Sequence, residues 1–117
     1  MDLYHCMITL KNDAKALAFA SAVDHWMTGL VDRGLIGSWR LYRRKFGLAA
    51  GAHSDVVLLI EVADMTQLEM AFRTLSEGSS ETDQRRFDLV HDMIAEVSIG
   101  LYRPYPDPVH RESVALI

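Results

Sequence analysis

The chain has 117 residues, of which 12 are Lys or Arg and 16 are Asp or Glu, and 50% of them are hydrophobic. This composition predicts one soluble globular domain, because the chain is too short for two cores and too apolar to stay disordered. A membrane span is excluded because it would need about 20 consecutive apolar residues. The longest strongly apolar run is only Val56 to Ile60.

The N-terminus and the charge pattern favour a cytoplasmic protein that binds neither membrane nor nucleic acid. Asp2 and His5 stand where a secretory signal would have a basic start and an apolar core. Cys6 is the single cysteine, and we interpret it as a small buried residue. Five basic residues lie between Arg33 and Lys45, but the isoelectric point is about 5.6, so a charged edge strand is a better interpretation than a nucleic-acid site.

The first half of the chain predicts a strand, a helix and a second strand. Residues 3–10 alternate in side-chain type, as expected of a strand with two different faces. An amphipathic helix follows, with Asp13 as its expected N-cap, Gly34 as its stop, and apolar residues at Phe19, Ala22, Val23, Trp26, Met27 and Leu30. Aromatic and basic residues alternate along 38–46, which predicts a strand, and 47–54 reads as a flexible connection.

The second half predicts a buried strand, two helices, a last strand and an arm. Residues 55–63 are almost continuously apolar, which is typical of a strand buried on both faces. Asp64 opens a helix that closes at 76–80, and a further helix is expected over 83–96. Residues 97–103 predict the last strand of a domain spanning 1–103. Three prolines then make 104–117 an extended arm.

This order of elements is β-α-β-β-α(α)-β, the split βαβ arrangement of the ferredoxin-like α+β fold. Right-handed crossovers predict an antiparallel sheet of strand order 4-1-3-2 with the helices on one face. The opposite face would then carry Leu3, Met7, Val57 and Leu59. Each side chain left in water would forgo about 1.5–3 kcal/mol of burial. A second copy of the sheet is the expected cover, and the protein is therefore expected to form a homodimer.

The sequence at this point resembles the dimeric α+β barrel superfamily, in which two ferredoxin-like protomers press their open sheet faces together. The resemblance covers about residues 2–103 and rests on the strand order, on the run 55–65 with the helix 68–72, and on the ending Gly-Leu-Tyr-Arg-Pro at 100–104. The sequence is similar to small bacterial members of this superfamily that have no assigned function. The superfamily includes cofactor-independent monooxygenases, haem-degrading enzymes, isomerases and ligand-binding proteins, so the resemblance implies a fold but no single reaction.

Aligning the ends of the first and third strands places His5 opposite Glu61 and Met7 opposite Leu59 on the open face. An imidazole beside a carboxylate is a candidate general base, and His5 and Glu61 are therefore the catalytic candidates. The alternative is a polar pair between strands or subunits. The candidate ligand-binding residues around them are Tyr102, Arg43 for an anionic group, Trp39, Met7 and Leu59.

No metal or cofactor is expected. The sequence has no nucleotide-binding glycine pattern and no paired cysteines, and His25, His91 and Glu96 lack the spacing of a zinc site. The leading hypothesis is a homodimer that binds a small apolar or aromatic ligand between its sheets. The alternatives are a non-enzymatic stress-response or interaction protein with a filled interface, and a cofactor-independent monooxygenase-like enzyme. Whether the protein is an enzyme stays open.

Overall fold

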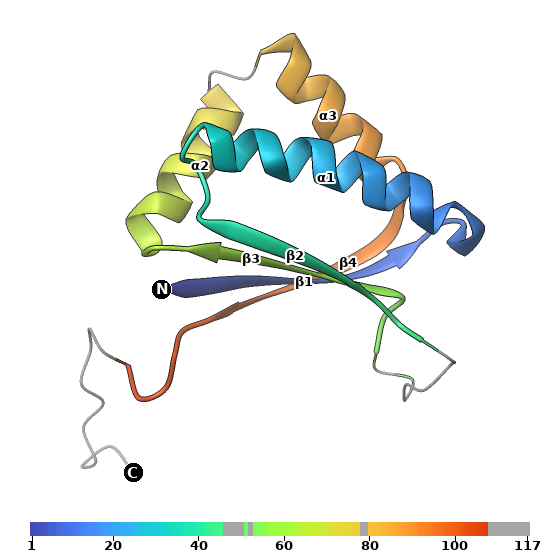
Figure 1. The fold of residues 1–117 in the computed structure, drawn as a ribbon, viewed down its shortest axis with the longest axis horizontal. Helices are drawn as coiled ribbons and strands as arrows, with labels where there is room; N and C mark the ends of the chain where they lie inside the picture. The colour runs from blue at the N-terminus through green and yellow to red at the C-terminus, as the bar shows by residue number, and fades with distance from the viewer. Residues whose placement is uncertain (46–50, 52, 78–79, 108–117) are drawn as a thin grey trace.

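The protein is an antiparallel sheet with its helices on one face (Figure 1). The computed structural model describes residues 1–45, 51, 53–77 and 80–107. Its elements in chain order are β1 (Asp2–Leu10), the short 3-10 helix η1 (Asp13–Lys15), α1 (Ala16–Asp32), β2 (Ser38–Arg43), β3 (Val56–Val62), α2 (Met65–Glu77), α3 (Glu81–His91) and β4 (Ile94–Tyr102). The strand order is β2-β3-β1-β4, which confirms the predicted ferredoxin-like topology. Most of the expected connection at 47–54 lies outside the described residues.

The ends of α1 show how local sequence sets a helix boundary. The expected N-cap was wrong: the Asn12 side chain accepts from the Ala14 amide at 3.0 Å and caps η1, which precedes α1. At the other end Gly34 has φ 70°, and the Gly34 and Leu35 amides donate to the carbonyls of Val31 and Leu30. These two bonds form a Schellman motif, so the predicted stop at Gly34 is confirmed.

The last helix is shorter than predicted. We expected it to reach residue 96, but α3 ends at His91 and β4 already begins at Ile94. Ile94 pairs with Leu10 of β1, and the Lys11 amide donates to the Met93 carbonyl. Pairing with β1 therefore overrides the helical spacing of this segment.

The core lies between the helices and the sheet. The buried strand residues are those predicted for this face on β1 and β3, namely Cys6, Ile8, Leu10, Val56, Leu58, Ile60 and Val62. They pack against α1, where Phe19 and Val23 are almost completely buried. None of the described helices is long and apolar enough to cross a membrane.

Strand β4 is less buried than β1 and β3 on the face that the helices cover. Val97, Ile99 and Leu101 lie on the helix-facing side, as the register with β1 shows, but their exposed fractions are 42%, 53% and 50%. The helices therefore leave this edge of the sheet uncovered. Val97 and Ile99 border a cavity between the sheet and the helices.

An ion cluster ties the end of β4 to the start of β1. The Arg103 guanidinium donates to Asp2 Oδ1 through Nε at 2.8 Å and to Asp107 Oδ2 through Nη1 at 3.0 Å. The Asp2 side chain is only 3% exposed. Residues 104–107 have no regular secondary structure, and the rest of the expected arm, 108–117, lies outside the described residues. The division of the chain at residue 103 stays a prediction.

Candidate functional site

The open sheet face has the predicted residues but a different register. Strands β1 and β3 pair so that His5 lies opposite Leu59, Met7 opposite Val57, and Leu3 opposite Glu61. The expected pairing of His5 with Glu61 is therefore wrong by two residues. A slip of two keeps every side chain on its predicted face, because strand side chains alternate with a period of two.

His5 and Glu61 have other partners on this face. The His5 ring packs edge-to-face on Tyr102, with ring centroids 5.6 Å apart, so these two predicted site residues do lie together. The Glu61 carboxylate accepts a hydrogen bond from the Ser38 hydroxyl at 2.8 Å. Within the part of the chain that the structure describes, no carboxylate orients the His5 ring, unlike the arrangement that the sequence suggested.

Two of the predicted ligand-binding residues lie on the other side of the sheet. Trp39 pairs with Ile60 and Arg43 with Val56, which places both on the helix-facing side of β2. Trp39 packs against the core, and the Arg43 guanidinium binds Asp13 Oδ2 at 3.0 Å. The side chains that β2 places on the open face are those of Ser38, Arg40 and Tyr42.

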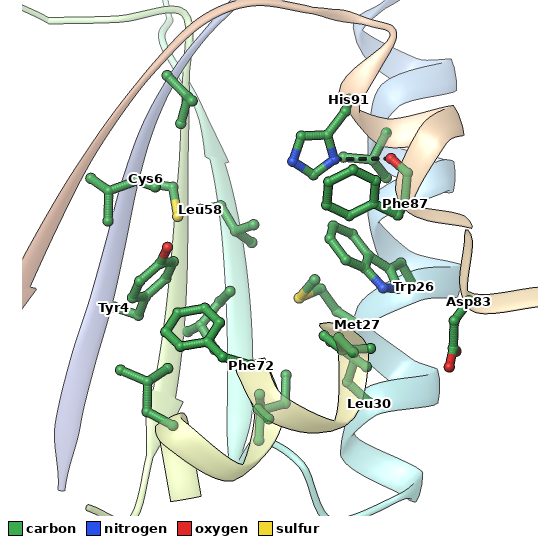
Figure 2. A pocket seen from close by; sticks show the side chains of 18 of the residues that line it. Tyr4, Cys6, Trp26, Met27, Leu30, Leu58, Phe72, Asp83, Phe87 and His91 are labelled. Carbon is green, nitrogen blue, oxygen red and sulfur yellow. Dashed lines mark hydrogen bonds between the residues drawn. The ribbon is translucent and has the colours of Figure 1, made fainter. Parts of the chain in front are cut away.

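A cavity that the sequence did not predict lies on the helix side of the sheet, within the described part of the chain (Figure 2). It has a volume of about 500 Å³, within the range of small-molecule sites. One wall is the sheet and the other walls are the three helices. Its lining is largely apolar and includes Tyr4, Cys6, Trp26, Met27, Leu30, Leu58, Leu68, Ala71, Phe72, Phe87, Val90, His91, Ile94, Val97 and Ile99.

Aromatic rings line two sides of this cavity. On the helix side, His91 stacks on Phe87 with centroids 3.7 Å apart and planes 18° apart, and Trp26 meets both edge-on. On the sheet side, Tyr4 and Phe72 pack edge-to-face at 5.7 Å. Figure 2 shows the two groups facing each other across the open space. This arrangement suits a flat apolar molecule.

The polar groups in the lining are few and carry little free charge. Asp83 is the only acid in the lining, and its carboxylate is paired with Arg33 at 2.7 Å; the lining holds no Lys or Arg. Burial raises the pKa of the Cys6 thiol to about 11 and raises the pKa of the Tyr4 phenol above 10.0, so both stay neutral at pH 7. Among the described residues, no group of His, Cys, Asp and Glu is arranged to hold a metal ion.

The sequence analysis did not predict this site, although the spacing of some of its residues could be recognised in the sequence. Phe87 and His91 are four residues apart on α3 and so share one face of the helix. Trp26 was interpreted as packing, but it lies at the cavity wall, and its indole Nε1 is buried without a hydrogen-bond partner in the described structure. Hydrophobic spacing identified the apolar faces, but it does not show whether two such faces touch or leave a space.

Comparison with known proteins identifies the family. The model of the family described as "Family of unknown function (DUF6614)" matches residues 1–117. The chain belongs to this family. No curated protein matches the DUF6614 chain significantly.

Several solved structures share the fold of this DUF6614 protein. A protein from Arabidopsis thaliana (At3g17210) superposes with a TM-score of 0.69 at 6% identity, covering 89% of this chain and 95% of that one. A putative antibiotic biosynthesis monooxygenase from Nitrosomonas europaea gives 0.63 at 15% identity, covering 90% and 99%. A dimeric ferredoxin-like protein of unknown function from Thermobifida fusca gives 0.60 at 13% identity, covering 87% and 90%. At these identities the similarity establishes the ferredoxin-like fold and no activity.

Proposed function

We propose that this DUF6614 protein is a homodimer in which each protomer binds a small, uncharged, aromatic molecule between its sheet and its helices. The observation that carries the proposal is the apolar cavity of about 500 Å³ with aromatic side chains on opposite sides. This changes the location expected from the sequence, which was the space between two sheets. The ligand-binding hypothesis itself is kept.

The lining argues for a ligand site over a packing defect. Protein interiors are close-packed, and a void of this size would forgo the dispersion contacts of every side chain around it. Ile99 and Phe72 are 53% and 51% exposed although both border the cavity. A bound apolar molecule would remove these surfaces from water, which is the expected source of its affinity.

The homodimer is supported by the other face of the sheet. Leu3, Met7, Val57 and Leu59 form its apolar centre on the two middle strands, and each is only partly buried in the single chain. The Thermobifida protein of the same fold is described as dimeric. Pairing two such faces would bury all four side chains in both protomers without using the cavity on the helix side.

Ligand binding is tested by closing the cavity from its exposed edge. Ile99→Trp adds a large side chain that enters the cavity, whereas Leu101→Trp changes a residue on the same face of β4 that does not line it. We expect naphthalene, titrated by calorimetry, to bind the native protein and the Leu101→Trp variant with similar affinity. Binding should weaken at least tenfold in Ile99→Trp. Equal binding to both variants, or no binding to the native protein, would contradict the proposed site.

The homodimer is tested by placing a charge on the open face. Light scattering should give twice the chain mass of 13.2 kDa for the native protein. Met7→Glu should shift it toward the monomer, because the carboxylate would be buried against a second apolar sheet. Leu89→Glu is the control, since Leu89 is 53% exposed on α3. A native protein that is monomeric at micromolar concentration would refute the assembly and favour an interaction protein whose sheet face binds a different partner.

A monooxygenase-like activity is the second candidate. The fold shared with the putative monooxygenase from Nitrosomonas is the observation that favours it. His5 remains a candidate base for such a reaction, but without Glu61 as its orienting group. Oxygen uptake with hydroxylated naphthalenes as substrates tests this activity, and a rate unchanged by His5→Phe would exclude His5 as the base.

A further inference from the structure

We infer that His91 makes the cavity selective for an aromatic ligand that carries a hydroxyl group, whose hydrogen is donated to the His91 Nε2 atom. This inference rests on the proposed ligand site and adds the chemical class of its ligand. It depends on the tautomer of one ring, on where that ring points, and on the absence of free charge among the residues that line the cavity.

The tautomer of the neutral His91 ring follows from its hydrogen bond. Its Nδ1 atom lies 2.9 Å from the Phe87 carbonyl oxygen one turn earlier on α3. A carbonyl oxygen only accepts, so Nδ1 must carry the hydrogen and donate it. In the neutral ring the second nitrogen, Nε2, is then an acceptor with a free lone pair. Nε2 forms no hydrogen bond with any described residue.

The orientation of the ring directs this acceptor to the ligand space. Figure 2 shows the Nδ1 side of His91 turned to the helix backbone and the Nε2 side turned toward the sheet, across the cavity. Stacking on Phe87 at 3.7 Å and the edge-on contact with Trp26 hold the ring in this orientation. The position of Nε2 is thus set before a ligand binds, which lowers the entropic cost of using it.

The other polar groups do not favour an anion or a cation. No Lys or Arg lines the cavity, and the Asp83 carboxylate is already paired with Arg33. The Tyr4 hydroxyl can both donate and accept, so it does not discriminate between ligands. His91 is exposed in the free protein, so water can reach its Nε2 atom, and a ligand that displaces this water needs a donor in its place. A hydroxyl on an aromatic ring supplies that donor without adding a charge.

The test compares two probes that differ in this hydrogen, 2-naphthol and 2-methoxynaphthalene. Calorimetric titrations use the native protein, His91→Phe and His25→Phe. His91→Phe keeps a ring that can stack on Phe87 but removes the acceptor. His25 is exposed on α1 and does not line the cavity, so His25→Phe is the matched control.

We expect the native protein and His25→Phe to prefer 2-naphthol by about threefold to tenfold, the range for one net hydrogen bond. In His91→Phe this preference should disappear, while 2-methoxynaphthalene binds within about twofold of its native affinity. A preference that survives in His91→Phe, or no preference in the native protein, overturns the role of His91 while leaving the cavity as a ligand site. If neither probe binds the native protein, the proposed function itself fails.

Discussion

The ion cluster at the start of β1 allows a quantitative test of how the two ends of the domain are joined. Asp2 is 3% exposed, and its two carboxylate oxygens accept from Arg103 Nε at 2.8 Å and Nη2 at 3.4 Å. Asp2→Asn keeps the shape and one acceptor but removes the charge. We expect it to lower the free energy of unfolding at pH 7 by about 1.5–3 kcal/mol, the range for a charge-assisted hydrogen bond.

The pH dependence of this effect has a defined sign. Hydrogen bonding and the positive charge of Arg103 hold the pKa of the Asp2 carboxyl below its ordinary value of 3.8, against the opposing effect of burial. A group whose pKa is lower in the folded state stabilises the fold above its unfolded pKa. That stabilisation is lost as the pH falls below about 3.8 and through the folded pKa. The difference between native protein and Asp2→Asn should therefore shrink on acidification.

Urea unfolding followed by circular dichroism at pH 7, 5, 4 and 3 measures this difference. The protein concentration must be constant, because the stability of a dimer depends on it. Asp32→Asn, an exposed position at the end of α1, controls for the loss of one negative charge and should change the free energy by no more than about 0.5 kcal/mol at pH 7. A difference for Asp2→Asn that is as large at pH 3 as at pH 7 would refute the ionic interpretation.

Two further predictions concern single residues. Gly34→Ala should lower the free energy of unfolding, measured with urea, by about 1–2 kcal/mol. Gly34 has φ 70° and no atom lies within 4 Å of an added Cβ, so the loss comes from backbone strain alone, and an unchanged urea midpoint would contradict this. Cys6 should react with iodoacetamide at pH 8 at least tenfold more slowly than free cysteine, because burial raises its pKa to about 11. Naphthalene should slow the reaction further, since Cys6 lines the cavity; acceleration by naphthalene would argue against binding there.

The topology could be predicted because it depends on local patterns. Alternation along β1 and β3 identified the buried face, and Gly34 marked the end of α1 through a conformation that glycine adopts at low cost. The end of α3 could not be predicted in this way. Ile94 continues the helical spacing, but it gains more by pairing with Leu10 in the sheet.

The candidate site shows a similar division. Alternation assigned His5 and Glu61 to the same face, but it is equally consistent with every register that differs by two residues. The strand ends served as a guide to register. The aligned ends, Leu3 and Ala63, each lie one residue from the observed ends, Asp2 and Val62, and together these errors shift the register by two. The face of the sheet on which Trp39 and Arg43 lie also depends on the register of β2. An edge strand of mixed aromatic and basic residues does not specify that register.

The sequence by itself determined the ferredoxin-like topology, the two faces of the sheet and the apolar surface on which the dimer proposal rests, because periodicity and turn residues act over a few neighbours in the chain. Only the tertiary structure decided the strand register and the presence of the cavity. The register depends on how whole strands pair across the sheet. The cavity depends on how far α2 and α3 lie from β1 and β4, a distance set by the summed packing of side chains remote in sequence. The orientation of His91 is likewise tertiary, since it combines a bond to Phe87 with a contact to Trp26 on another helix.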